Sequence, residues 1–207
     1  MVEGQTSYPV SVRGELTEPP GRGWWLLKWL LVIPHIIILA FLWIAFVVVC
    51  IIAFFAILFT SKYPKGLFNF NMGVLRWTWR VGFYSYSALG TDKYPPFSLD
   101  PDDSYPADLK IEYPEKLSQG LVLVKWWLLA IPHYVVIAFL QGGVGKSNGG
   151  GLASILAIFA GFALLFTGKY PGDIFKLVVG MNRWTYRVAA YASLMTDQYP
   201  PFRLWDD

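Results

Sequence analysis

Residues 76–81 read RWTWRV and residues 183–188 read RWTYRV, so one short pattern occurs twice in this chain. Because self-similarity along a chain indicates a repeat architecture, we compared the sequence on either side of the two copies. Four further motifs recur in the same order: Tyr8-Pro9 with Tyr105-Pro106, Ile33-Pro34-His35 with Ile131-Pro132-His133, Phe59–Pro64 with Phe166–Pro171, and Thr91–Phe97 with Thr196–Phe202. The sequence therefore predicts two tandem units, residues 1–103 and 104–207, joined by a polar, turn-rich linker near Asp100–Ser104.

The composition is that of a membrane protein. Hydrophobic residues make up 55% of the 207 residues, aromatic residues 18% and charged residues only 15%, and the mean hydropathy is +0.43. Two long apolar regions, Trp24–Phe59 and Leu121–Phe166, carry most of this excess. Since a bilayer span needs roughly 20 apolar residues, we expect both regions to enter a membrane. The N-terminal segment carries no apolar signal core, and the single cysteine, Cys50, predicts a packing role.

The spacing between motifs predicts how each apolar region folds. The offset between the copies is 98 at Ile33 and Ile131 but 107 at Arg76 and Arg183, so the second unit holds nine additional residues. The glycine-rich stretch QGGVGKSNGGG (141–151) is the obvious insertion, and its backbone cannot lie unsatisfied in hydrocarbon. A loop there makes a helical hairpin of residues 121–167. By homology we expect a hairpin of residues 24–60 with a tight turn near Leu42–Ala45, because one helix of that length would be about 54 Å long. The predicted fold is an all-α membrane protein with two tandem transmembrane hairpins and four spans.

Charge then predicts the topology. The two hairpins would leave 16 of the 17 lysines and arginines on one face and only Lys146 on the other. The positive-inside rule places both termini and the linker in the cytoplasm. The tryptophans at the start of each hairpin would form an aromatic belt at the membrane boundary: Trp24, Trp25, Trp29, Trp126 and Trp127.

The segments after the hairpins, residues 67–89 and 174–194, read as amphipathic helices. Their basic residues fall at steps of three and four on one narrow face that also holds Gly73 and Gly180; they are Arg76, Arg80, Lys176, Arg183 and Arg187. This pattern is typical of a helix that lies in the interface plane with its arginines toward lipid phosphates. A third span in each unit is the alternative, but it would bury two arginines in the membrane at a cost of roughly 2.5–3.5 kcal/mol each.

Four short stretches alternate apolar and polar residues in the way that strands do. They are Tyr8–Leu16, Phe97–Leu99, Asp108–Tyr113 and Phe202–Trp205. We expect them to pair as short strand-like flanks on the cytoplasmic side.

The motif string Lys-Trp-x-Leu-hydrophobic-Ile-Pro-His, Phe-Thr-x-Lys-Tyr-Pro, Arg-Trp-Thr-aromatic-Arg-Val and Thr-Asp-x-Tyr-Pro-Pro-Phe resembles the bacterial membrane domain of unknown function 4389. The resemblance covers nearly the whole chain as two tandem copies. It implies a multi-pass protein of the bacterial inner membrane and supplies no catalytic residues. The chain departs from the compact pattern at Gln141–Gly151, which puts in doubt a generic role for the outer end of the second hairpin.

His35 and His133 are the two histidines of the chain, and each follows a proline inside an apolar run. Ionisable residues in membrane helices indicate function by default, and two equivalent imidazoles are able to ligate a haem iron or a pigment metal. The favoured interpretation is structural: each histidine hydrogen-bonds a backbone carbonyl freed by its proline. No other ligand type accompanies them, so no cofactor is predicted.

Two further patterns do not predict chemistry. Asp92 and Asp197 form a symmetric carboxylate pair, but an aspartate in this motif more often caps a turn or pairs with an arginine. Residues 142–147 (GGVGKS) resemble part of a phosphate-binding loop, but Leu140 stands where the pattern needs glycine and no strand precedes it. We therefore expect no nucleotide and no nucleic acid as partners.

These observations predict a non-enzymatic membrane protein that contacts lipids. The expected role is an accessory, scaffolding or assembly subunit of a larger bacterial inner-membrane complex, with other membrane subunits as partners. A small transporter or channel component is the second hypothesis, since tandem repeats are common there, but the spans hold few polar residues to line a pore. A haem or pigment carrier that uses His35 and His133 is the third.

Overall fold

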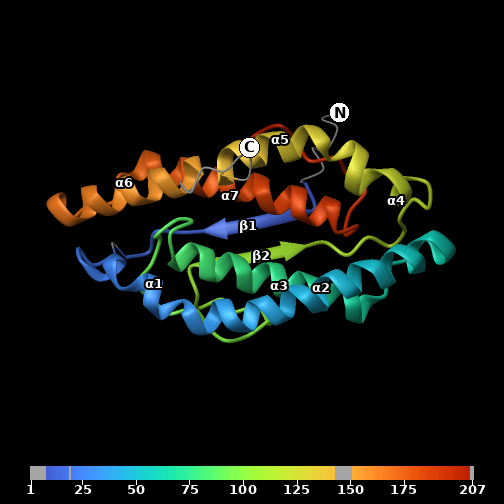
Figure 1. Cartoon of the computed structure of the whole chain (residues 1–207), viewed down its shortest axis with the longest axis horizontal. Coiled ribbons are helices and arrows are strands. Elements are labelled where there is room, and N and C mark those ends of the chain that lie inside the picture. The colour runs from blue at the N-terminus through green and yellow to red at the C-terminus, as the bar shows by residue number, and fades with distance from the viewer. Residues whose placement is uncertain (1–7, 19, 143–150, 206–207) are drawn as a thin grey trace, which may run out of the picture.

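The computed structural model describes residues 8–18, 20–142 and 151–205, which are mostly helical with one two-stranded ribbon among them (Figure 1). The first unit contains β1 (Val10–Gly14), the 3-10 turn η1 (Trp24–Leu26), α1 (Lys28–Leu31), α2 (Ile33–Thr60) and α3 (Lys65–Tyr84). The second contains β2 (Ala107–Ile111), α4 (Leu121–Val124), the π-helical turn η2 (Lys125–Leu129), α5 (Ile131–Gln141), α6 (Leu152–Thr167) and α7 (Gly172–Ala192). A half-turn about the viewing axis of Figure 1 exchanges the two units.

The first apolar region forms one continuous helix and not a hairpin. Helix α2 runs unbroken for 28 residues, so the turn predicted at Leu42–Ala45 and the hairpin of residues 24–60 are wrong. Residues 36–59 hold no glycine, proline or charged side chain, and nothing among them interrupts the helical hydrogen bonds. The chain reverses later, where Ser61 ends α2 in the left-handed conformation (φ 57°) and Pro64 precedes α3.

The second apolar region forms the same kind of rod, built from more than one helix. Helix α6 continues in the direction of α5 (Figure 1), so the hairpin of residues 121–167 is also wrong. The backbone of Gly151 lies directly against Gln141 and Gly142, where no Cβ would fit. The 11 residues of α5, Gly151 and the 16 residues of α6 correspond to the 28 residues of α2. The helix therefore resumes its course at Gly151. Residues 143–150, with Lys146, which was predicted on the outer face, lie outside the described residues.

The four predicted spans are not found, because each apolar region builds one rod instead of two antiparallel arms. Within the described ranges α2 is the one helix that is long and apolar enough to cross a membrane. A second candidate exists if Leu121–Gln141, which bends by 41°, counts as one span. We refer to α1–α2 as the first rod and to α4–η2–α5–α6 as the second rod.

The start of the second rod contains one residue more than the start of the first. Five positions separate Lys28 from Ile33, but six separate Lys125 from Ile131. The additional residue lies in η2, whose five residues form a π-helical turn where the first unit has the α-helical α1. A π-turn is the usual way for a helix to absorb a single insertion without changing the orientation of the residues on either side. Lys125 and His133 consequently keep the environments that Lys28 and His35 have.

Deletion of Trp127 is expected to convert η2 into an α-helical turn and leave the fold intact. The shortened sequence KWLLAIPH would match KWLLVIPH (28–35) in all but one position. We expect a melting temperature within about 4 °C of the wild type, the shift that about 1 kcal/mol causes in a chain of this size. Deletion of Val135, which is also exposed but lies inside regular α5, is the control: it rotates the flanking residues by about 100° and displaces His133 or Leu140 from the core. Thermal unfolding followed by circular dichroism in mild detergent measures both; equal losses would refute the role of the π-turn.

The two strands pair as an antiparallel ribbon in which Val12 faces Leu109. The strand predictions for Tyr8–Leu16 and Asp108–Tyr113 are thus confirmed in their central parts, whereas Phe97–Leu99 and Phe202–Trp205 form no strand. One face of the ribbon is buried, with Val10, Val12, Ala107, Leu109 and Ile111 at most 3% exposed. The other face carries Ser11, Arg13, Asp108 and Lys110.

Each strand packs against the helix of the other unit. Strand β2 of the second unit lies on α3 of the first, and β1 of the first unit lies on α7 of the second. Rings from α3 and α7 also meet directly, Trp79 with Tyr186 at 5.5 Å and Phe83 with Phe175 at 6.0 Å between centroids. The two units therefore share one hydrophobic core.

Candidate functional site

A buried lysine at the start of each rod is tied to the Thr-Asp motif of the same unit. Lys28 Nζ lies 2.9 Å from Asp92 Oδ1 and donates to the Thr91 carbonyl oxygen at 2.7 Å. In the second unit, Lys125 Nζ lies 2.7 Å from Asp197 Oδ1 and 3.0 Å from the Thr196 carbonyl oxygen. Both lysines are 0% exposed. Burial lowers the pKa of Lys28 from its usual value, and the hydrogen bond and charge of Asp92 oppose that shift.

The aspartates of these pairs have their oxygens engaged. The second carboxylate oxygen of Asp92 accepts from the backbone N–H of Gly21, and that of Asp197 accepts from Ser118 N–H at 2.6 Å. The motif's own turn is held by the threonine, since the Thr91 hydroxyl accepts from Lys93 N–H at 3.1 Å, so the capping role predicted for the aspartate is wrong. The charged partner of the aspartate is a lysine and not the expected arginine. The sequence did hold a signal for the lysine partners: Lys28 and Lys125 occupy equivalent positions in otherwise apolar runs. The pairs close each unit by joining its loop to its rod.

Each histidine is held by a tryptophan of the following helix. Trp77 Nε1 donates to His35 Nδ1 at 3.0 Å, and Trp184 Nε1 donates to His133 Nδ1 at 3.1 Å. Phe97 stacks on the His35 ring at 4.0 Å, and Phe202 on the His133 ring at 4.3 Å. The partner is thus an indole N–H, where the sequence had suggested a backbone carbonyl.

This geometry does not fit a haem or pigment ligand. An indole N–H can only donate, so Nδ1 is the acceptor and the proton of the neutral ring resides on Nε2. A protonated Nε2 has no lone pair for a metal. Each ring is also enclosed by the aromatic residues of its own unit, and α2 and α5 lie on opposite edges of the molecule (Figure 1). The two imidazoles cannot approach one iron from both sides.

Replacement of Trp77 by Phe is expected to destabilise the protein by about 1–3 kcal/mol, the cost of leaving a buried acceptor unsatisfied. Trp184→Phe is the matched variant in the second unit, and the two losses should add because the pairs share no partner. Denaturant unfolding of the two single variants and the double variant in mild detergent measures this. A double variant no less stable than either single variant would argue against two independent pairs.

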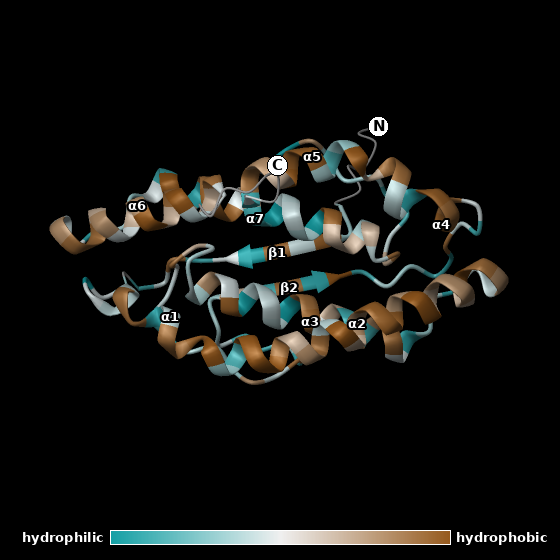
Figure 2. Ribbon diagram, in the orientation of Figure 1, coloured by the Kyte–Doolittle hydropathy of each residue, from teal (hydrophilic) through white to brown (hydrophobic). Residues whose placement is uncertain are grey.

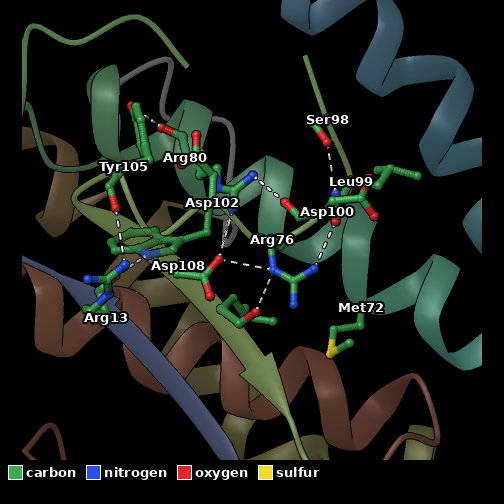
Figure 3. A network of polar contacts seen from close by, with 12 residues as sticks. Arg13, Met72, Arg76, Arg80, Ser98, Leu99, Asp100, Asp102, Tyr105 and Asp108 are labelled. Carbon is green, nitrogen blue, oxygen red and sulfur yellow. Dashed lines mark hydrogen bonds and ion pairs between the residues drawn. The ribbon is translucent and has the colours of Figure 1, made fainter. Parts of the chain in front are cut away.

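The arginines of α3 point into the protein, toward the ribbon and the loop that follows the helix (Figure 3). Arg76 Nε lies 3.1 Å from Asp108 Oδ1 and donates to the Leu109 carbonyl oxygen at 2.9 Å. Arg80 Nη2 lies 3.0 Å from the same carboxylate oxygen, and its Nη1 donates to the Asp100 carbonyl oxygen at 2.9 Å. Arg76 and Arg80 are 4% and 0% exposed. One carboxylate from the second unit thus joins two guanidinium groups from the first.

The second unit has a related arrangement in which backbone carbonyl oxygens accept from the arginines. Arg183 donates to the carbonyl oxygens of Val12 and Leu204, and Arg187, which is fully buried, donates to that of Arg203. Since Val12 accepts where Leu109 accepts in the first unit, the position equivalent to Asp108 is one residue before Val12, and it holds Ser11. The two units therefore hold an aspartate and a serine at corresponding strand positions.

The helices predicted at residues 67–89 and 174–194 are present, but the side on which their arginines lie was predicted wrongly. Arg76, Arg80 and Arg187 are buried where the sequence predicted them to face lipid phosphates, and Arg183 is half-buried. The physical reason is that carbonyl groups of the ribbon and the loops satisfy these donors as water would. The glycines on this helix face were a sign of burial that sequence reasoning missed. A Cβ at Gly73 would crowd Leu99 and one at Gly180 would crowd Leu204, so the face packs closely. Lys176 is exposed, and its contact with lipid headgroups stays a prediction.

The two rods consist mostly of apolar residues, as the hydropathy colouring of the ribbon in Figure 2 shows, and many of these side chains are exposed. The most exposed side chains occupy equivalent positions in the two units: Phe59 and Phe166 at 76% and 79%, and Phe41 and Phe139 at 69% and 71%. An apolar groove of about 400 Å³ connects the rods; it is lined by Val47, Cys50, Ile51, Phe54 and Phe55 of α2 with Trp126, Ala192 and Leu194. Contiguous exposed apolar surface of this kind marks a site that contacts a membrane or another protein.

Comparison with known proteins places the chain in a family. The family model described as Domain of unknown function (DUF4389) matches residues 23–98 and, a second time, residues 122–203. The chain belongs to the DUF4389 family. Each DUF4389 match runs from the start of a rod to the Tyr-Pro-Pro-Phe loop, so it includes the Lys–Asp and His–Trp pairs and leaves out both strands. No curated protein and no solved structure matches the chain.

The same contacts occur in both DUF4389 copies, and in each copy they join a loop to the start of a rod. Lysine, histidine and the adjacent aromatic rings fix the loop after α3 or α7 to the start of the rod before it. Within the described ranges no cluster of three or more histidine, cysteine, aspartate or glutamate residues is arranged to hold a metal ion. The Lys–Asp and His–Trp pairs stabilise the fold, and neither kind of pair places a nucleophile beside a base.

Proposed function

We propose that this DUF4389 protein is a non-enzymatic membrane protein that serves as an accessory, scaffolding or assembly subunit of a larger complex in the bacterial inner membrane. The observation that carries the proposal is the apolar outer surface of both rods, with Phe41, Phe59, Phe139 and Phe166 at its most exposed points. A chain that leaves so much apolar area uncovered by itself requires lipid, another protein or both to cover it. Both chain ends lie on the cytoplasmic side in this proposal.

The polar residues favour a scaffolding role over catalysis. Buried charged groups of the first unit form ion pairs, Lys28 with Asp92 and Arg76 with Asp108, and are thereby committed to the fold. Lys176 and the surface lysines remain as contacts for lipid headgroups.

A site-specific crosslinking experiment in intact membranes tests the proposed function. A photo-reactive amino acid replaces Phe41 or Phe139 on the apolar surface, and Lys110 on the polar face serves as the matched control position. We expect the Phe positions to capture membrane components. We also expect one protein to co-purify in stoichiometric amount in mild detergent, where mass spectrometry identifies it. Purification without a stoichiometric partner would refute the subunit role and leave the membrane location standing.

A further inference from the structure

The hydrogen bonds between α2 and α3 fix which residues lie at the same height along the rods. Asn71 Nδ2 donates to Cys50 Sγ at 3.3 Å, and Trp43 Nε1 donates to Thr78 Oγ1 at 3.2 Å. Arg76 lies between these two contacts on α3, so it is level with the middle of α2. The carboxylate of Asp108, 3.1 Å from Arg76, is at the same height.

Charged side chains are exposed at that height. Asp100, Asp103 and Lys110 are exposed and line a cleft together with Arg76 and Asp108. If α2 crossed a bilayer along its axis, these residues would lie near the centre of the hydrocarbon, where each charge costs roughly 2.5–3.5 kcal/mol. A membrane-crossing orientation of α2 therefore conflicts with the residues beside it.

The two rods present their apolar sides to one common surface. The pseudo-twofold axis runs along the viewing direction of Figure 1 and is perpendicular to both rods, so it brings equivalent side chains to the same height along that axis. The apolar groove confirms this continuity, because exposed side chains of α2 and exposed Trp126 of the second rod line it together. The polar face of the ribbon, with Ser11 and Lys110, is not part of that surface.

Basic residues lie at both ends of the rods. Lys62, Lys65 and Lys116 surround the end of α2. At the other end of the molecule, the guanidinium of Arg22 lies beside Gly168, next to exposed Lys169. Lysines and arginines at the edge of an apolar surface complement the phosphates of a lipid leaflet.

We propose that the rods lie in the plane of the membrane and bury their common apolar surface in a single leaflet, so that the chain enters the bilayer without crossing it. The occupant of this surface is lipid, and the ribbon with its charged face is directed to water. Interfacial helices sink by about 5–10 Å, which is enough to cover the exposed phenylalanines. This inference rests on the proposed membrane location and specifies its geometry.

Cysteine labelling tests the orientation. In a Cys50→Ser background, single cysteines replace Arg22 near the start of the first rod, Lys62 after its end, and Lys110 on the ribbon; all three positions are exposed. A membrane-impermeant maleimide is applied to spheroplasts and to inverted inner-membrane vesicles, and flotation of the vesicles reports membrane attachment. We expect all three cysteines to react in inverted vesicles and none in spheroplasts.

The other outcomes separate the two proposals. Reaction of Arg22→Cys and Lys62→Cys from opposite sides would show a crossing helix and overturn the in-plane geometry while leaving the membrane role intact. Protein that fails to float with the vesicles would overturn both.

A second measurement distinguishes lipid from a covering protein. Nitroxide labels at Phe41, Phe59, Phe139 and Phe166 are expected to show similar, shallow depths in vesicles of phosphatidylethanolamine and phosphatidylglycerol. Labels shielded from lipid-dissolved oxygen would indicate a protein on this surface instead, and depths that differ between Phe41 and Phe59 by tens of ångströms would contradict the proposal.

Discussion

Separation of the chain between Asp103 and Ser104 is expected to abolish the folding of both halves when each is produced alone. Each half would lose the strand that covers its own helix, because β2 packs on α3 and β1 packs on α7. The first half would lose buried Leu109 and Ile111, each worth about 1.5–3 kcal/mol on burial. It would also lose Asp108 between Arg76 and Arg80. These losses together approach the whole stability of a typical domain, about 5–15 kcal/mol.

The halves produced together are expected to recover the native structure, since every contact between them is non-covalent. Co-purification through a tag on one half, with circular dichroism and thermal unfolding of the product, measures the recovery. The control is the intact chain with a flexible Gly-Ser linker inserted after Asp103, which keeps both strands available and should fold normally. A soluble or detergent-stable first half that unfolds cooperatively without the second would show that the exchanged ribbon is dispensable.

Replacement of Asp108 by Ala is expected to cost about 3–5 kcal/mol, the typical penalty for removing one member of a buried ion pair. The variant would leave Arg76 and Arg80 in the interior with carbonyl partners but without a neutralising carboxylate. The side chain of Asp108 is only 18% exposed, so solvent screens the pair weakly. Denaturant unfolding in mild detergent measures the loss, and Asp108→Asn should lose less because the amide oxygen still accepts a hydrogen bond.

The second unit supplies the control for this variant. Ser11 occupies the position equivalent to Asp108, is exposed, and carries no charge. Its replacement by Ala is expected to change the free energy of unfolding by no more than about 0.5 kcal/mol, as for ordinary surface substitutions. If Ser11→Ala and Asp108→Ala had equal effects, the arginine pair of α3 would not depend on the carboxylate.

Sequence reasoning could identify the two copies, the amphipathic helices and the strands, because each leaves a local pattern. It could not place the reversals of the chain. The nine additional residues of the second unit indicated a loop, and a loop in an apolar run reads as the tip of a hairpin. Whether the helix turns back or resumes its course depends on the close approach of Gly151 to Gln141, which is a tertiary contact.

In the candidate site, too, sequence reasoning could identify residues but not their tertiary contacts. His35 and Asp92 stood out by residue type and repeated position, but their partners lie far away in the sequence, Trp77 by 42 residues and Lys28 by 64. The chain has ten tryptophans, and nothing local indicates which one reaches a histidine. The arginines were assigned to the correct helix face, yet periodicity cannot tell whether that face meets water or the carbonyl groups of a ribbon.

The exchanged ribbon constrains what a shorter relative can look like. A chain with a single DUF4389 unit and its strand would have a helix that lacks a cover and a strand that lacks an edge to join. Two such chains would satisfy each other only as a homodimer about a true symmetry axis, with both arginine pairs facing identical side chains. Fusion of the two genes frees the copies to diverge. Asp108 and Ser11 are an example of such divergence: they occupy corresponding strand positions, and only Asp108 is charged.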